Sequence, residues 1–390
     1  MQQRLNFLVG LVVSGVVGLS AEVAYAYPQY IAKGYATCGS CHYNADGGGA
    51  LNAYGAATVE AMIPEELPVT FVEELREVLG KVFVSGYDDD DLPAFQWDVG
   101  LDSRLLLVGA VTDIGGSKEP YIIPMLMEAH SVAGWGRWGV YGSVGPRKTS
   151  SPDGQDHFFM HSRYHWLQYR ASDEVALRFG KMVVPFGLKI PDHTVTTRKG
   201  LGFDKYDQSY GAMLDWQTES LALGVMAFAG ESPWKESGLQ ERGLSVSISH
   251  LIPGRAAIGF SGLYGDTGFS TRLIAGLHAR VQGPAKTYCL IEGDLERKGN
   301  TSAKDPQLQF VGYTRLGWFP RGWLDVFAEL RYLDFLPSGS EEGEAPRELG
   351  AMLGLNWQVL PWVELSPGVM LNQLESGAEL TWLGQLHFVY

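Results

Sequence analysis

Several features are scarce in this chain of 390 residues, and each scarcity narrows the class of protein. Beyond the N-terminus, no apolar run is long enough to form a membrane-spanning helix. Basic residues number 30 against 44 acidic ones, and the net charge of −14 argues against nucleic acid as a partner. The chain has no phosphate-binding glycine loop, no Ser/His/Asp arrangement and no hydrolytic carboxylate pair. Only three cysteines are present, and two of them belong to one short motif.

The first 26 residues have the pattern of a secretory signal peptide. Arg4 precedes an apolar run over residues 5–19, and small residues flank Tyr25 before the expected cleavage after Ala26. A membrane anchor is the alternative, but the run is shorter than the roughly 18–20 apolar residues that span a bilayer. No cysteine lies near the cleavage site, which argues against a lipoprotein. We expect a mature chain that begins at Tyr27.

The two paired cysteines lie in the motif Cys38-Gly39-Ser40-Cys41-His42, which is typical of covalent attachment of c-type haem. Each thiol can form a thioether to a haem vinyl group, and the adjacent histidine is then an axial iron ligand. A redox-active disulfide would be expected in a βαβ context, and a zinc site would need a second ligand pair. Because neither occurs nearby, the motif predicts one haem c bound by Cys38, Cys41 and His42.

Residues 27–95 are predicted to form a small, mainly α-helical haem domain followed by a linker. A glycine-rich stretch at 46–49 follows the motif, and an amphipathic helix is expected around 72–82, where apolar residues recur at helical spacing. The acidic run 88–91 is interpreted as the linker.

From about Phe95 the apolar residues recur with a period of two, which indicates β-strands. In 323–332, for example, Val326 and Leu330 alternate with the charged Glu329 and Arg331. A β-sandwich or a membrane barrel could produce this alternation, so the loops are needed to distinguish them.

The connections alternate between tight turns and long polar loops, which is typical of outer-membrane barrels. Tight turns are expected near residues 172, 218, 253, 283, 320 and 360, and long loops at 145–156, 186–206, 231–240, 297–306 and 334–346. The last strand ends on the aromatic Tyr390, which resembles an outer-membrane assembly signal. We therefore predict an antiparallel barrel of about sixteen strands over residues 96–390. Its strands are expected to start near 95, 119, 132, 157, 173, 207, 219, 241, 254, 269, 285, 307, 321, 347, 361 and 378.

The sixth haem ligand has several candidates. Met62 lies in the haem domain, although it could equally be a core methionine. His193 lies in the longest loop, which could fold back into a pore as long porin loops often do. His157, His161 and His165 recur every four residues and are expected to face the lumen, opposite the lipid-facing Phe158, Met160, Tyr164 and Trp166. They could bind haem, hold a metal ion in transit, or be ordinary polar residues of the lumen.

Other inward residues could balance charge rather than hold a ligand. Cys289 shares a face with Ile291 and Leu295 and is interpreted as lipid-facing. The lumen arginines could pair with haem propionates or with lumen acids; they are Arg104, Arg163, Arg178, Arg315 and Arg331.

The whole chain resembles the fused outer-membrane monohaem cytochrome c–porins, including those associated with ferrous-iron oxidation. The resemblance lies in the order of signal peptide, Cys38–His42 motif, short linker and barrel, and in the glycine-rich tail after His42. It implies outer-membrane electron transfer through one haem in or beneath the barrel of a Gram-negative bacterium. An extracellular donor such as Fe(II) would deliver electrons to a periplasmic carrier protein.

Two alternatives remain at this point. The chain could be a solute or ion channel whose haem domain is a redox-sensitive plug or sensor. The barrel could also be only an anchor for a periplasm-facing cytochrome. If the protein is an enzyme, we expect an oxidoreductase of the electron-transfer type. Outer-membrane lipid would surround the barrel, and porin-like barrels often form trimers.

Overall fold

The computed structural model describes residues 28–33, 96–112, 116–150, 156–190, 195–203, 208–231, 240–300, 306–336, 347–360, 362–374 and 377–389, and these are mainly strands. The first half of the sheet contains β1 (Gln96–Thr112), β2 (Gly116–Trp135), β3 (Trp138–Ser150), β4 (Asp156–His161), β5 (His165–Arg170), β6 (Val175–Met182), β7 (Ser209–Gln217) and β8 (Leu221–Phe228). The second half contains β9 (Arg242–Ile252), β10 (Ala256–Asp266), β11 (Ser270–Gln282), β12 (Thr287–Asn300), β13 (Gln307–Arg321), β14 (Leu324–Leu336), β15 (Arg347–Leu360), β16 (Val363–Leu374) and β17 (Gly377–Val389). The helical elements are η1 (Pro28–Lys33), α4 (Thr196–Lys199) and η3 (Pro284–Lys286).

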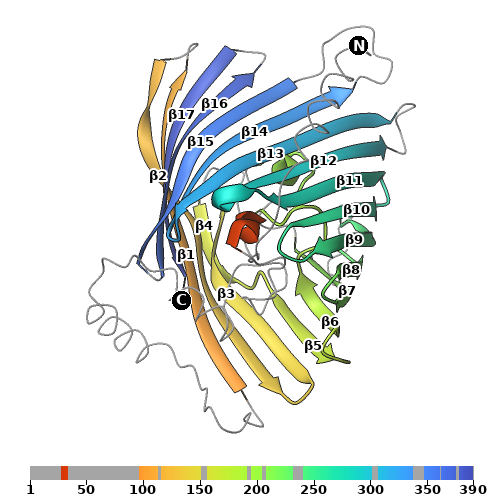
Figure 1. Cartoon of the computed structure of the whole chain (residues 1–390). Coiled ribbons are helices and arrows are strands. Elements are labelled where there is room, and N and C mark those ends of the chain that lie inside the picture. Colours follow the sequence, from red (N-terminus) through yellow and green to blue (C-terminus); the bar gives the residue numbers. More distant parts are fainter. Residues whose placement is uncertain are drawn as a thin grey trace, which may run out of the picture.

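The strands form one closed antiparallel barrel (Figure 1). Each strand pairs with its sequence neighbours, and β17 closes the barrel on β1 from Asp102↔Val389 to Thr112↔Glu379. β4 and β5 both pair with β3 and together fill one position, so the barrel has sixteen strand positions. The predicted barrel is confirmed. Each predicted strand start lies close to an observed one, with the largest discrepancy at 132 against Trp138.

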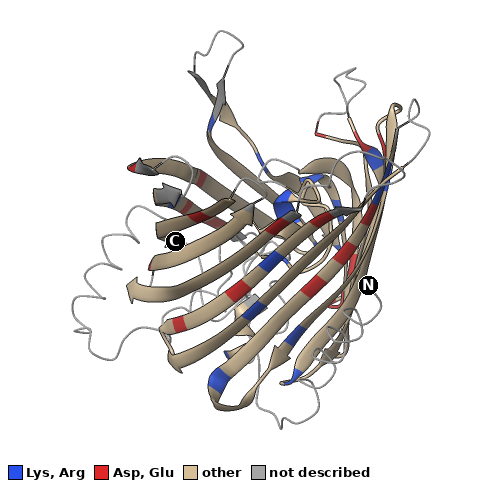
Figure 2. Cartoon of the chain, turned by 90° about the horizontal axis from the view of Figure 1, so that it is seen from above, with Lys and Arg blue, Asp and Glu red and all other residues tan. Residues whose placement is uncertain are grey.

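The outward face of the barrel is apolar and the inward face carries the charges. On β14, Val326 and Leu330 are exposed on the outside, while Asp325, Glu329 and Arg331 are buried within the barrel. Figure 2 shows acidic and basic residues distributed along the strands. An outward apolar band with a polar interior is the arrangement of a barrel that has lipid outside and water inside.

Exposed tryptophans gather at the end of the barrel where the short turns lie. Six of the seven exposed tryptophans among the described residues lie at or near this end: Trp97, Trp135, Trp138, Trp216, Trp318 and Trp357. The seventh, Trp382, lies within β17 opposite Gly109. Aromatic girdles of this kind mark the level of a membrane–water interface. The turns at this end are short, such as 218–220 and 253–255. The opposite end carries the longer connections, such as 183–208, as predicted, together with short ones such as 267–269. Within the described ranges, no helix is long and apolar enough to cross a membrane.

One barrel strand is interrupted between β4 and β5, and the interruption reverses its faces. Gly145 of β3 pairs with His161, and Gly142 of β3 pairs with His165. Three residues of β3 thus separate the two pairs, whereas four residues separate them on the opposite side. One extra residue is therefore inserted on the β4–β5 side. Because side chains alternate with a period of two, a one-residue insertion moves every following side chain to the other face.

Candidate functional site

The connection between β6 and β7 runs along the inner wall of the barrel. Its described residues, 183–190 and 195–203, are mostly buried, including Val184, Phe186 and Leu201. They pack against inward side chains of the wall such as Met213 and Ile274. We call residues 183–190 and 195–203 the lumen loop. As a long loop, it was predicted from the sequence; its burial against the wall is a structural finding.

Hydrogen bonds fix the lumen loop to the strands from β9 to β13. The contacts are Gly187 N to Ser261 Oγ (2.9 Å), Leu188 N to Glu292 Oε1 (3.1 Å), Ser245 Oγ to Pro185 O (2.6 Å), Thr196 Oγ1 to Gly312 O (3.0 Å), Gln309 Nε2 to Gly200 O (2.7 Å) and Arg272 Nη1 to Leu201 O (2.6 Å). Gly187 has a φ of +56°, and a Cβ there would lie 1.6 Å from Glu292 Oε1. Only glycine therefore fits this close approach to the wall.

The N-terminal segment η1 also lies inside the barrel (Figure 1). It contacts β11, β12 and β13. Ile31 and Ala32 are 1% and 3% exposed. Lys33 donates a hydrogen bond to the carbonyl oxygen of Gly322 in the β13–β14 turn, which places this end of η1 at the short-turn end of the lumen. The lysine nitrogen also lies 4.5 Å from the centre of the Phe319 ring.

The lumen loop and η1 meet in one apolar cluster inside the barrel. The cluster contains Ile31 and Ala32 from η1, Leu188, Ile190 and Val195 from the loop, and Tyr288, Leu290, Tyr313 and Phe319 from the wall. Full burial of a side chain the size of isoleucine contributes about 1.5–3 kcal/mol. A porin-type lumen is ordinarily polar, so an apolar cluster of this size marks a place where chain, rather than water, fills the interior.

Two buried carboxyl groups lie under the lumen loop on β12. Glu292 and Asp294 are 3% and 1% exposed. Glu292 Oε1 accepts from Leu188 N, but Glu292 Oε2 and both Asp294 carboxyl oxygens have no hydrogen-bond partner within the described part of the chain. Buried polar groups without partners cost free energy, so the apolar packing around the loop must compensate for these two carboxyls.

The opposite side of the lumen carries a paired charge network. Asp102 accepts a hydrogen bond from His387 Nε2 (3.0 Å) and lies 3.4 Å from Arg104. Arg163 Nη1 lies 3.3 Å from Glu128. Tyr141 OH and His130 Nδ1 are 2.7 Å apart. These groups come from β1, β2, β3, β17 and the interruption between β4 and β5, so the network bridges the seam where the barrel closes.

The predicted lumen arginines pair with lumen acids. Arg104 pairs with Asp102, Arg163 with Glu128, Arg178 with Asp215 (3.3 Å), Arg315 with Glu329 (3.5 Å) and Asp325 (3.9 Å), and Arg331 with Glu329 (2.7 Å). Of the two roles that the sequence left open for them, these contacts fit the balancing of lumen acids.

The predicted face of one histidine is wrong. His161 lies on the inward side, with Nε2 3.3 Å from Lys181 Nζ and 4.0 Å from Glu231. His165 instead shares the face of the exposed Leu167, and both of its ring nitrogens have partners, Ser162 Oγ (2.8 Å) and Tyr210 OH (2.9 Å). The strand interruption explains the error, because its extra residue breaks the four-residue spacing.

Trp166 was predicted to face lipid, and this too is wrong for the same reason. It is 5% exposed and stacks on Tyr141 at a centroid distance of 4.1 Å, within the cluster that packs on the lumen loop. Tyr164 is also partly buried against this cluster. Cys289 lies on the lipid-facing side of β12, as predicted, because its strand neighbours Tyr288 and Leu290 are buried on the inward side.

The other predicted site residues lie outside the described residues: Cys38, Cys41, His42, Met62 and His193, together with the side chain of His157. Within the described ranges, no group of three or more His, Cys, Asp or Glu side chains is arranged to hold a metal ion. Sequence reasoning missed the burial of η1, although the apolar pair Ile31-Ala32 between polar residues was a weak signal. The sequence analysis also missed Glu292 and Asp294, because acidic residues at every second position are expected on any lumen-facing strand.

Comparison with known proteins shows the fold. No protein-family model matches the chain, and no curated protein matches it in sequence. Solved structures do match. OmpT of Vibrio cholerae superposes with a TM-score of 0.58 at 11% identity, over 78% of this chain and 100% of OmpT. An anion-selective porin from Comamonas acidovorans gives 0.55 at 8% identity, over 76% and 100%. The outer-membrane channel DcaP of Acinetobacter baumannii gives 0.52 at 10%, over 78% and 100%. The chain thus has a porin-like, sixteen-strand barrel fold.

Proposed function

We propose that the protein is an outer-membrane channel whose lumen is partly filled by its own N-terminal segment. The observation that carries this proposal is the burial of Ile31 and Ala32 between the lumen loop and the β11–β13 wall. The apolar outer band and the tryptophan girdle support a membrane location. The likeness to an outer-membrane channel and to an anion-selective porin supports conduction as the activity.

Conductance in planar lipid bilayers tests this proposal. The full mature chain is expected to show discrete conductance steps, and a variant lacking residues 28–33 is expected to show larger ones. The matched control is Ile31→Val, which keeps an apolar side chain in the cluster. If neither the mature chain nor the shortened variant conducts, the channel proposal is wrong.

A second candidate function is electron transfer through a c-type haem, and the position of η1 favours it. Cys38 follows Lys33 by five residues, so its Cα lies within about 18 Å of that of Lys33, because each residue of extended chain spans at most about 3.6 Å. Lys33 lies at the short-turn end of the lumen. A haem on Cys38 and Cys41, with His42 as axial ligand, would therefore be held in or just beneath the barrel.

The haem would supply one-electron redox chemistry when bound, and the barrel would control access to it. An extracellular donor such as Fe(II) and a periplasmic electron-carrier protein are the proposed partners. Cation entry would be favoured by the net acidic chain.

The candidates for the sixth ligand can now be weighed. His165 is disfavoured because both of its ring nitrogens already have partners, which leaves Met62, His161 and His193. Cleavage after Ala26 would add another candidate, the α-amino group of Tyr27, directly before η1. An amine of this kind has a pKa of about 7.7–8.0, so its neutral, metal-binding form is accessible near neutral pH.

A visible spectrum of the purified protein, followed by anaerobic titration with Fe(II), tests the haem proposal. Sharp reduced-haem bands that appear with Fe(II) would support electron transfer from that donor. Bands that appear only with dithionite would favour a haem-bearing plug or another donor. Cys38→Ala with Cys41→Ala should abolish covalent haem, and a host able to mature c-type cytochromes that yields no haem protein would contradict the proposal.

A further inference from the structure

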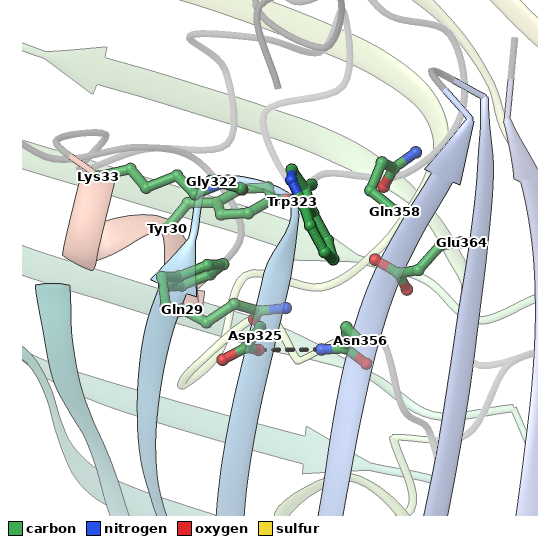
Figure 3. A pocket seen from close by; sticks show the side chains of 10 residues that line it. Gln29, Tyr30, Lys33, Gly322, Trp323, Asp325, Asn356, Gln358 and Glu364 are labelled. Atoms are coloured by element: carbon green, nitrogen blue, oxygen red, sulfur yellow. Dashed lines mark hydrogen bonds between the residues drawn. The ribbon is translucent and has the colours of Figure 1, made fainter. Parts of the chain in front are cut away.

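The two carboxyl groups beneath the lumen loop lack the partners that another buried acid of the inner wall has. Asp325 on β14 is 2% exposed, and it accepts hydrogen bonds from Tyr288 OH and from Asn356 Nδ2, both at 3.0 Å (Figure 3). Glu292 and Asp294 on β12 are buried to the same extent. Glu292 Oε2 and both carboxyl oxygens of Asp294 nevertheless have no hydrogen-bond partner in the part of the chain that the structure describes.

Both carboxyl groups lie beneath the same part of the lumen loop. Residues two apart on a strand point to the same side, with their Cα atoms about 7 Å apart. Glu292 Oε1 accepts a hydrogen bond from Leu188 N at 3.1 Å. A Cβ added to Gly276 of β11 would lie 1.9 Å from Asp294 Oδ1 and 3.4 Å from Phe186 Cζ. The carboxyl group of Asp294 therefore occupies the space between β11 and the loop.

The lumen loop adds a third buried oxygen from a different element. Thr197 in α4 is 2% exposed and lies beside Glu292, and its Oγ1 has no hydrogen-bond partner within the described ranges. The cationic Arg198 also acts electrostatically on Glu292, but its Nε has no partner either. Two carboxylates and one guanidinium leave one negative charge without compensation when both acids are ionised.

The donor set fits a hard metal ion. Buried charges in proteins are either paired or coordinate a metal, and ligands that are all oxygens suit Ca²⁺ or Mg²⁺. Calcium tolerates irregular geometry, with about 6–8 oxygens at roughly 2.3–2.6 Å, whereas magnesium needs a near-ideal octahedron. We propose that Glu292, Asp294 and Thr197 bind a calcium ion. The site has two acidic side chains and a hydroxyl, and water completes the coordination.

The bound ion acts on the lumen loop. Its carboxylate ligands belong to the wall and its hydroxyl ligand to the loop, so the ion joins the two elements, as the hydrogen bond from Leu188 N to Glu292 does. It also lowers the free-energy cost of burying the two carboxylates, which apolar packing alone offsets in the ion-free chain. The inference is independent of the channel proposal, because binding is measured without a membrane potential or a conducted solute.

Equilibrium dialysis of the detergent-solubilised full chain against radioactive Ca²⁺ tests the site near neutral pH, with excess Na⁺ present to suppress weak surface binding. We expect one saturable calcium ion per chain. Asp294→Asn and Thr197→Val are each expected to weaken the binding at least about tenfold. Calcium should also raise the urea midpoint of unfolding of the wild type and leave that of Asp294→Asn unchanged.

Glu296→Gln is the matched control. Glu296 is 6% exposed on the same face of β12, two residues after Asp294, but it lies 3.7 Å from Arg272 Nη1. Removing this paired acid should leave calcium binding unchanged. A loss in Glu296→Gln equal to that in Asp294→Asn would overturn the inference, because calcium would then bind the acidic residues without preference for the site.

Two further results would overturn the inference. One is the absence of saturable calcium binding by the wild type, which is expected if protons or Arg198 compensate for the carboxyls. The other is binding by Asp294→Asn equal to that of the wild type. If Asp294→Asn does not fold, Thr197→Val decides the question, since calcium binding that is unaffected by loss of the hydroxyl would contradict a site shared between the wall and the loop.

Discussion

The two sides of the lumen differ in how their inward side chains are used. On the β11–β14 side, apolar residues such as Leu290 and Tyr313 are covered by η1 and the lumen loop. On the seam side, around β1, β2 and β17, polar and charged groups such as Asp102, Arg104 and His387 pair with one another. Both sets of groups are buried, with Asp102 2% and His387 6% exposed, so the two sides differ in what compensates for burial: apolar packing on the covered side and polar pairing at the seam. The covered side holds the N-terminal segment in place.

The covered side is also where polar groups are least satisfied. Asp102 on the seam side has two partners, Arg104 and His387, whereas neither carboxyl oxygen of Asp294 beneath the loop has a hydrogen-bond partner among the described residues. Stability on the seam side therefore depends on intact pairs, and stability on the covered side depends on apolar packing that compensates for costly buried carboxyls.

The largest effect is expected from Arg315→Met, which removes a buried cation from the covered side. The guanidinium lies 3.5 Å from Glu329 and 3.9 Å from Asp325, and it stacks over Phe327 with its central carbon 3.4 Å from the ring centre. Removing one partner of a buried charge network costs about 3–5 kcal/mol. Urea unfolding of the folded barrel in detergent measures this loss. Arg321→Met at the exposed turn is the control and should change stability by less than about 0.5 kcal/mol.

Ile31→Asp breaks the apolar cluster and is expected to release η1 from the lumen. A carboxylate at a position that is 1% exposed, without a partner, costs roughly 2–4 kcal/mol of docking free energy. Residues 28–33 should become sensitive to added protease, and conductance steps should grow. Protection equal to that of Ile31→Val would show that the apolar cluster does not hold the segment.

On the seam side, Asp102→Asn tests whether the charge network stabilises barrel closure. The change leaves Arg104 and His387 without their common carboxylate and is expected to cost about 1–3 kcal/mol. The heat-induced shift of the folded barrel on a gel, calibrated by urea titration, measures it. Glu219→Gln, at an exposed position in the β7–β8 turn, should leave the transition unchanged, and an equal loss in both variants would contradict the assignment.

The last test of the covered side concerns pH. Burial lowers the pKa of Lys33 to about 8 from its ordinary value of 10.5, although Asp325 and Glu364 act in the opposite direction. Between pH 8 and 10.5, Lys33 therefore keeps its proton in the released segment and loses it in the docked one. Docking should strengthen as pH rises from about 8 to 10.5 and change little below 8. Protease protection of η1 measures this trend, which should disappear in Lys33→Met; the opposite slope would contradict the sign.

The barrel could be predicted from the sequence because its determinants are local and repeated. Alternation such as Val326–Leu330 against Glu329–Arg331 sets the faces, and polar turns set the strand ends. The interruption at residues 162–164 could not be predicted in this way, since one extra residue leaves no mark in composition. Its effect on His165 and Trp166 follows from pairing with β3, which is a long-range property.

The lumen site was less predictable for the same reason. A long connection after β6 signals a loop but not its attachment to Glu292, Gly312 and Gln309, which lie about a hundred residues later. The burial of η1 against β11–β13 spans a still larger separation. The predicted haem residues Cys38, Cys41 and His42 stay a prediction, since they lie outside the described residues.

The closure of β17 on β1 has a consequence for the order of biogenesis. The partners of η1 are all available once β13 and the lumen loop have formed, before the last strand completes the ring. A segment that is bound before β17 pairs with β1 is enclosed inside the barrel when the two strands pair. A truncated chain that ends after β16 would then retain the segment on an open sheet, and the finished pore would acquire its occupant without threading it through the mouth.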